Sequence, residues 1–119
     1  MADIEASLER VMSVDGAIAA ALVDSGSGYV LGKLGDGLDM HAASAGSTDL
    51  VRAKLKTVKA LNLDDMIEDI LITMGEYYHI IRPVTREPGL FLYLVLDKSR
   101  SNLAIARLCA ASVEGDMFA

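Results

Sequence analysis

Residues recur at helical spacing in two short segments, one near each end of the chain. The first segment follows Asp3, which is placed to cap the first amides of a short helix. The second follows Ser99 or Ser101, either of which can cap a helix that runs to Gly115. The spaced positions are Ile4, Leu8, Val11 and Met12 in the first segment and Leu103, Ala106, Arg107 and Ala110 in the second.

Between these segments the pattern predicts a longer helix. It begins after Asp39, which can cap it, and it closes at Asn62, which can adopt a left-handed conformation. The small side chains of residues 41–47 make its first half narrow, so another helix or a sheet can approach closely. The stripe that defines this helix consists of Met40, Ala43, Ser47, Leu50, Val51, Leu55, Val58 and Leu61.

Five further runs have the length and composition of strands. They are residues 17–24, 29–34, 66–74, 77–84 and 90–96. Gly75-Glu76 predicts a type II′ turn, and the run 90–96 is apolar at odd and even positions, so helices are expected on both sheet faces. The predicted order is αββαβββα, an α/β (α+β) fold with a five-stranded antiparallel sheet.

Composition narrows the class of protein. With 119 residues, 52% of them apolar, the chain fits one folded domain over residues 1–119. The net charge of −6 argues against nucleic-acid binding, and no apolar run approaches the ~20 residues of a membrane span. The acidic start lacks the positive charge of a signal peptide, and the one cysteine, Cys109, fits a reducing compartment. We therefore expect a cytoplasmic location.

The sequence contains few candidate catalytic or metal-binding residues. His41 and His79 lie on different predicted elements, and neither has a neighbouring histidine, cysteine or carboxylate at ligand spacing. We interpret His41 as a surface residue and His79 as part of strand packing. No paired catalytic groups are evident, so we expect no enzymatic activity, no metal and no cofactor.

A cluster of cations is the charge feature that suggests a function. Arg52, Lys54, Lys56 and Lys59 fall within eight residues of the long helix. One interpretation is a solvated helix face, stabilised by cations near the helix C-terminus. The other is a basic patch of Arg52, Lys56 and Lys59 that orients an acidic partner surface.

The order of elements and several local sequences resemble the roadblock (dynein light chain) family. The sequences are residues 16–24 with the strand start Gly28-Tyr29-Val30, and the start of the final helix at residues 101–107. The resemblance covers nearly the whole chain and implies that the long helix lies on one sheet face and the two shorter helices on the other. It also implies a homodimer that binds a small Ras-like GTPase and supplies no catalytic arginine of its own.

In the implied dimer, the third strands pair edge to edge and the long helices lie side by side. Glu68 and Asp69 are adjacent acids on this predicted edge, and acids on an edge oppose pairing. The residues that we assign to the interface are Ala42, Ala45, Gly46, Asp49, Ala53, Met66, Glu68, Ile70 and Ile72.

Two alternatives to GTPase binding stay open. A sensory domain would hold a small ligand between the sheet and a helix, in a cavity with converging polar groups. A structural dimer would tether a larger signalling complex regardless of the nucleotide bound to its partner.

Overall fold

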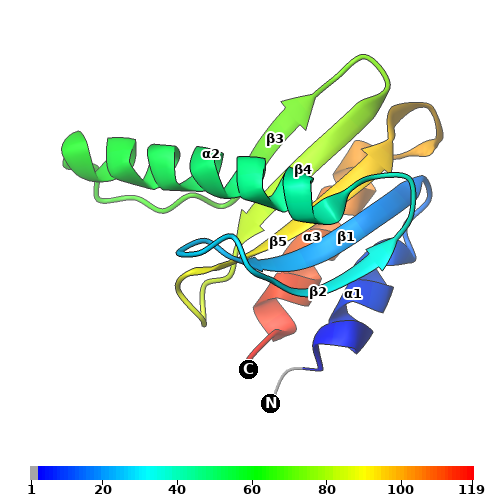
Figure 1. Ribbon diagram of the computed structural model, residues 1–119, viewed down its shortest axis with the longest axis horizontal. Helices are drawn as coiled ribbons and strands as arrows, with labels where there is room; N and C mark the ends of the chain where they lie inside the picture. Colours follow the sequence, from blue (N-terminus) through cyan, green and yellow to red (C-terminus); the bar gives the residue numbers. More distant parts are fainter. Residues whose placement is uncertain (1–2) are drawn as a thin grey trace.

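A computed structural model describes residues 3–119, and within them the elements follow the predicted order (Figure 1). The helices are α1 (Ile4–Met12), α2 (Met40–Ala60) and α3 (Leu103–Asp116). The strands are β1 (Ala17–Asp24), β2 (Val30–Gly35), β3 (Ile70–Thr73), β4 (Tyr77–Pro83) and β5 (Leu90–Asp97). A short 3₁₀ helix, η1 (Lys98–Arg100), joins β5 to α3.

All strand pairs are antiparallel, and across the described residues the sheet has the order β2-β1-β5-β4-β3. Alternate residues of β5 enter two separate hydrophobic clusters. Leu92, Leu94 and Leu96 pack with α1 and α3, whereas Phe91, Tyr93 and Val95 pack in the cluster that contains residues of α2. The predicted α+β fold and the placing of helices on both sheet faces are therefore confirmed.

Small residues in β1 bring the layers close together. Ala19, Ala20 and Ala21 have no exposed surface, although they point alternately to opposite faces. Gly35, with φ +95°, has its Cα so near the β1 backbone that a Cβ there would collide with the carbonyl of Ile18. Only glycine fits this position without displacing β1.

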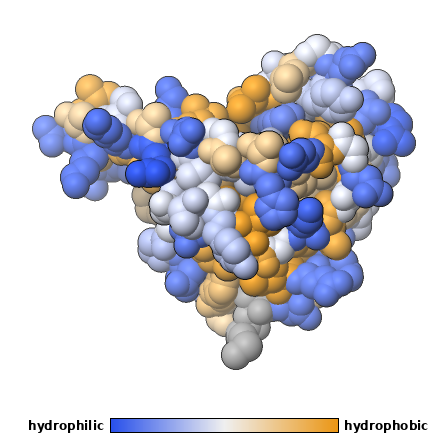
Figure 2. All heavy atoms as spheres, in the orientation of Figure 1, coloured by the Kyte–Doolittle hydropathy of each residue, from blue (hydrophilic) through white to orange (hydrophobic). Residues whose placement is uncertain are grey.

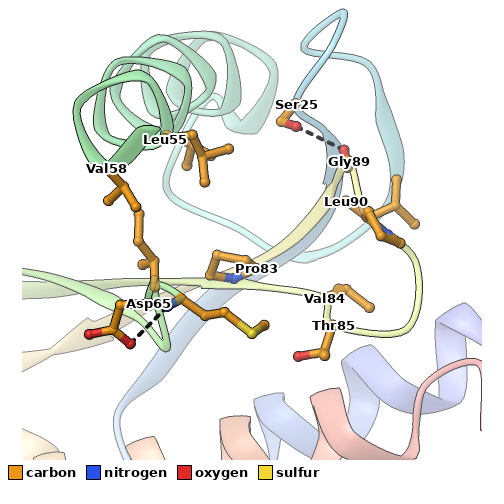
Figure 3. Close-up of a pocket in the computed structure, with 13 residues that line it drawn as sticks. Ser25, Leu55, Val58, Asp65, Pro83, Val84, Thr85, Gly89 and Leu90 are labelled. Atoms are coloured by element: carbon orange, nitrogen blue, oxygen red, sulfur yellow. Dashed lines mark hydrogen bonds between the residues drawn. The ribbon is translucent and has the colours of Figure 1, made fainter. Parts of the chain in front are cut away.

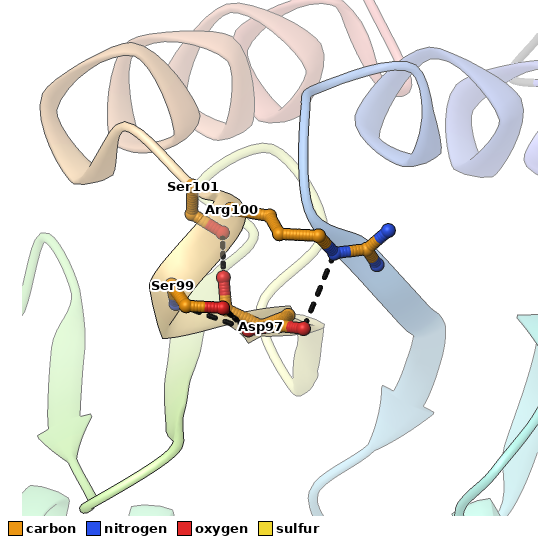
Figure 4. Close-up of polar contacts among 4 residues, drawn as sticks. All are labelled: Asp97, Ser99, Arg100 and Ser101. Carbon is orange, nitrogen blue, oxygen red and sulfur yellow. Dashed lines mark hydrogen bonds and ion pairs between the residues drawn. The ribbon is translucent and has the colours of Figure 1, made fainter.

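The connection from β5 to α3 is fixed by a polar network around Asp97 (Figure 4). The Asp97 carboxylate accepts hydrogen bonds from the Ser99 amide at 3.0 Å and from the Ser99 hydroxyl at 2.8 Å, and it pairs with Arg100. These hydrogen bonds from Ser99 are the main cause that holds the pKa of Asp97 below its ordinary value. The prediction that Ser99 or Ser101 caps the final helix is wrong, because both serine hydroxyls donate to Asp97. The N-cap is Asn102, whose side chain accepts a hydrogen bond from the Ile105 amide.

The predicted strand at residues 66–74 is shorter than expected. It begins at Ile70, and residues 63–69 form an extended segment without strand pairing. The Asp69 carboxylate instead binds the Arg107 guanidinium through two contacts of 2.8 and 3.0 Å. The prediction of a type II′ turn at Gly75-Glu76 is also wrong. Gly75 does not have the positive φ that this turn requires.

A buried ion pair joins α3 to the sheet. Glu114, 5% exposed, accepts from Arg82 at 3.0 Å and from the Thr85 amide at 3.2 Å. Replacing Glu114 by alanine leaves the Arg82 guanidinium, 17% exposed, without its charged partner, so we expect the free energy of unfolding to fall by about 2 kcal/mol. Urea denaturation followed by circular dichroism measures this loss.

The control is Asp116→Ala on the same helix, which removes the exposed ion pair with Arg10. Exposed pairs contribute below about 1 kcal/mol, so this variant should unfold near the wild-type midpoint. Equal losses in the two variants would contradict the special role of the buried pair.

Candidate partner-binding surface

The first half of α2 is anchored on the sheet. Asp39 caps the helix by accepting a hydrogen bond from the Ala42 amide at 3.2 Å. Its buried residues are Met40, Ser44, Ser47, Thr48 and Val51, most of them small, and Met40 and Val51 belong to the same cluster as the alanines Ala19 and Ala21 of β1. Small side chains on both sides of this contact hold the helix close to the sheet.

The second half of α2 extends beyond the sheet, and we call it, together with the C-cap residue Leu61, the arm (residues 52–61; Figure 1). Val58 is half-buried and all the other arm residues are exposed. The arm includes Leu55, 46% exposed, and Leu61, 62% exposed, and Leu63 follows it at 52%. The apolar stripe predicted from the sequence therefore continues past the point where the sheet can cover it.

Arg52, Lys56 and Lys59 share one flank of the arm. At 3.6 residues per turn their directions fall within about 60° of one another, whereas Lys54 points to the opposite flank. All three side chains are exposed, and among residues 3–119 no ion pair includes them. Figure 2 shows the protruding arm covered mostly by hydrophilic residues. The structure thus groups the predicted patch on an accessible surface.

The small residues assigned to the dimer interface form an exposed stripe along α2. Ala42, Ala45, Gly46, Asp49 and Ala53 are all exposed, and helical geometry puts them within about 60° of a line opposite Val51. A Cβ added at Gly46 would meet no atom within 4 Å. This side of α2 is open to another molecule.

The other residues assigned to the interface lie at the β3 edge of the sheet. Ile70 and Ile72 are half-buried in β3, which pairs with β4 on one side only. Met66 and Glu68 belong to the extended segment before β3 and are exposed, Met66 at 69%. The two groups of predicted interface residues therefore occupy two exposed places, the outer side of α2 and the β3 edge.

A cavity of about 250 Å³ lies under the arm, between α2, residues 65–67 and the β4–β5 loop (Figure 3). Most of the residues that line it are apolar, including Leu55, Val58, Pro83 and Leu90. Of the polar residues near it, Ser25 already donates its hydroxyl to the Gly89 carbonyl at 3.0 Å. Asp65 and Thr85 are the other polar residues of the lining, and the Asp65 carboxylate accepts a hydrogen bond from the Met66 amide at 2.8 Å.

A buried polar pair lies beside this surface, on the sheet face that α2 covers. The Tyr93 hydroxyl and His79 Nδ1 are 2.7 Å apart, and Tyr93 is 1% exposed. Burial lowers the pKa of His79 and raises that of Tyr93, the latter effect opposed by the Ser47 hydroxyl of α2. The prediction that His79 takes part in strand packing is confirmed, but its partner Tyr93 has no signal in the sequence.

Residues 3–119 contain no group of three or more histidine, cysteine or carboxylate side chains that could hold a metal ion. Over the same residues, no helix combines the length and the apolar character of a membrane span.

Comparison with known proteins identifies the fold. No protein-family model and no curated protein sequence matches the chain. Among solved structures, Myxococcus xanthus MglB superposes with a TM-score of 0.82 at 17% identity, over 94% of this chain and 89% of MglB. A Roadblock/LC7 domain from Streptomyces avermitilis gives 0.75 at 13% identity, over 94% and 88%.

A third structure, described as MglB with tetrameric arrangement, gives a TM-score of 0.80 at 16% identity, over 93% of this chain and 82% of that one. At these identities the likeness concerns the fold. The chain is a roadblock-type domain in its fold, and the resemblance noted in the sequence is confirmed at that level. Among these structures it is similar to MglB in particular.

The lowered pKa of His79 makes stability depend on pH. Because the unfolded chain binds a proton near the ordinary pKa of 6.5 and the folded chain does so only at lower pH, the free energy of unfolding should fall as pH drops below 6.5. The fall continues until pH passes the folded pKa. Urea midpoints of the wild type, measured between pH 8 and pH 5, should therefore decrease as the pH is lowered; this slope is the quantity to compare between variants.

His79→Asn should flatten the slope, whereas His41→Asn, at an exposed position of α2, should leave it unchanged. An equal slope in the wild type and in His79→Asn would assign the pH dependence to other groups.

Proposed function

We propose that this chain is a cytoplasmic homodimer that binds a small Ras-like GTPase and acts as its regulator or adaptor, without a catalytic site of its own. The observation that carries the proposal is the arm of α2, which leaves the sheet with apolar residues still exposed and a basic flank directed to solvent. The roadblock-type fold supports it, because the family resemblance implies such a partner.

The exposed leucines of the arm favour a second copy. Burying a leucine side chain contributes about 2 kcal/mol, and Leu55, Leu61 and Leu63 are each about half exposed or more in the single chain. A two-fold partner that packs along α2 and the β3 edge would cover part of this surface. The similar MglB structure with tetrameric arrangement also supports self-association in this fold.

Electrostatic repulsion between paired β3 edges should be weaker than the sequence suggested. Glu68 and Asp69 precede β3 rather than lying in it, and Asp69 is neutralised by Arg107. The edge strand β3, which contains Ile70 and Ile72, therefore carries no acidic residue. Its backbone groups can pair with those of the same strand in another copy. The exposed stripe along α2 would let the α2 helix of a second copy approach closely. Its residues are Ala42, Ala45, Gly46, Asp49 and Ala53.

The basic flank suits the GTPase. In a chain of net charge −6, three grouped cations form a local exception that can attract an acidic surface, and two-fold symmetry would present the patch twice. Bound there, the GTPase would be anchored, or its own switch loops would be ordered so that hydrolysis is faster. A purely structural tether would instead bind the GTPase equally in both nucleotide states.

Gly46→Arg tests the α2 stripe. The added side chain meets no atom within 4 Å in the single chain, and replacing a helical glycine does not weaken the fold, so the protomer should stay folded. A packed partner would meet the arginine directly. Light scattering should therefore give a dimer for the wild type and a monomer for Gly46→Arg at the same concentration.

The matched control is Ala6→Arg, which adds the same side chain at an exposed position of α1 and should remain dimeric. A wild-type protein that is monomeric at every concentration would refute the homodimer. A dimeric Gly46→Arg would remove the stripe from the interface.

Lys56→Glu/Lys59→Glu tests the basic flank. Reversing two charges at a binding rim should weaken GTPase binding about tenfold at low salt and reduce its salt dependence, since rim charges act mainly through long-range attraction. Titration calorimetry against candidate GTPases in both nucleotide states measures the affinity.

The matched control compares single reversals: Lys33→Glu, at an exposed position of β2 away from the arm, should change binding by less than about twofold, whereas Lys56→Glu alone should weaken it severalfold. Similar losses in both variants would attribute the effect to net charge rather than to the basic flank.

A further inference from the structure

The cavity under the arm reaches the surface of the molecule at Leu55. This side chain lines the cavity and is still 46% exposed, so it forms part of the rim. Figure 3 shows Leu55 between Val58 of the same helix and Ser25 of the β1–β2 turn. A side chain from another molecule can therefore enter beside Leu55 without displacing the core.

The rim of the cavity adjoins the basic flank of the arm. Arg52 and Lys59 are three and four residues from Leu55, so helical geometry places their side chains next to it on the helix surface. Among residues 3–119 neither cation forms an ion pair. An apolar cavity and two available positive charges thus meet at one place.

This flank lies on the side of α2 that faces the β1–β2 turn. A Cβ added at Gly28 of the turn would lie 3.7 Å from Thr48 Oγ1 and 3.9 Å from Ala45 Cα. At 3.6 residues per turn, Thr48 and Ala45 point within about 40° of Arg52. Ser25 of the same turn lines the cavity, so the turn borders both the flank and the cavity.

The proposed homodimer would leave the cavity unfilled. The exposed stripe along α2 lies opposite Val51, whereas Val51 lines the cavity, so the two surfaces are on opposite sides of the helix. Strand β3 contributes no residue to the lining. Among residues 3–119, Met66 is the one residue that belongs both to the lining and to the residues assigned to the dimer interface.

We propose that the cavity binds an aromatic side chain projecting from the GTPase, and that Arg52 and Lys59 bind carboxylates beside that side chain. This inference rests on the proposed function and names the feature of the partner that the arm recognises. Volume selects the ring, because a dry cavity of about 150 Å³ can hold benzene and this cavity measures about 250 Å³. Charge selects its neighbours, because cations at the rim attract an acidic surface.

Asp65 determines the direction in which the partner's acids lie. Figure 3 shows Asp65 and Ser25 at opposite ends of the cavity. A carboxylate placed beside Asp65 would meet a like charge, which opposes binding. The acids next to the ring therefore lie toward Ser25 and the basic flank. An aromatic anchor held in a pocket, with charged contacts around it, is a common arrangement of the residues that dominate a protein interface.

The first test uses two small probes with the same phenyl ring. 3-Phenylpropionate carries a carboxylate, and 3-phenylpropylamine carries a cation. NMR titration of the Val51, Leu55 and Val58 methyl groups should give a Kd of about 1–10 mM for 3-phenylpropionate, as expected for a ligand of this size. The amine should bind at least fivefold more weakly.

Arg52→Glu should abolish this preference, whereas Lys33→Glu on β2 should retain it. Methyl signals of the lining that do not shift at tens of millimolar 3-phenylpropionate would overturn the proposal. Equal affinities of the two probes for the wild type would also overturn it, because the flank would then not act on a bound ring.

The second test fills the cavity with Leu55→Trp and measures GTPase binding by calorimetry. The chain contains no tryptophan, so the emission of the new indole reports its surroundings. An indole in the cavity emits at shorter wavelength than one in Leu108→Trp, a 72% exposed position on the opposite face of the sheet. Leu55→Trp should weaken binding at least tenfold, and Leu108→Trp should bind as the wild type does.

A surface that needed only apolar contact would bind Leu55→Trp as well as the wild type or better, since the indole adds apolar area. Val58→Phe, at a half-buried position of the lining, should give the same loss whichever way the tryptophan turns. Circular dichroism confirms that the variants are folded.

Unchanged GTPase binding in both Leu55→Trp and Val58→Phe would overturn the inference and retain the proposed function. If 3-phenylpropionate also bound in that case, the cavity would belong to a free small ligand. A wild type that binds 3-phenylpropionate with the expected preference but binds no candidate GTPase would refute the proposed function, and with it the GTPase as the source of the ring.

Discussion

Burial of β5 on both faces is the constraint on which the rest of the structure depends. Its residues alternate between two clusters, and each cluster needs a helical layer to exclude water. The alanines of β1 let those layers come close, and Gly35 lets β2 lie tightly against β1. The positions of α1 and α3 on one face and of α2 on the other follow from this requirement.

The same constraint explains why the arm is free. The sheet needs only the first half of α2 to cover the cluster around Ala19, Ala21 and Tyr93, and the helix then continues beyond the sheet. Its exposed leucines and its basic flank are thus not used by the fold of the single chain. Surfaces that a fold does not use, and that remain apolar, commonly bind partners, which links the architecture to the proposed function.

Ion pairs decide the details at the edge of the sheet. Arg107 holds Asp69 from the opposite side of the sheet to α2, and this contact ends the extended segment where β3 begins. The same helix also uses Glu114 and Asp116 in ion pairs within the chain. The helices α2 and α3 therefore lie on opposite faces of one sheet.

The sequence by itself determined the order of the elements, the antiparallel meander and the cover on both faces, because these follow from local periodicity and from the apolar run in β5. It also placed Arg52, Lys56 and Lys59 on one exposed side of a helix, since helical spacing is local. Only the tertiary structure decided where β3 begins, that Asn102 rather than a serine caps α3, and that His79 bonds to Tyr93. It also decided where the sheet ends under α2. These features depend on groups far apart in the chain, and no local pattern encodes which distant side chain will reach a given carboxylate, hydroxyl or helix face.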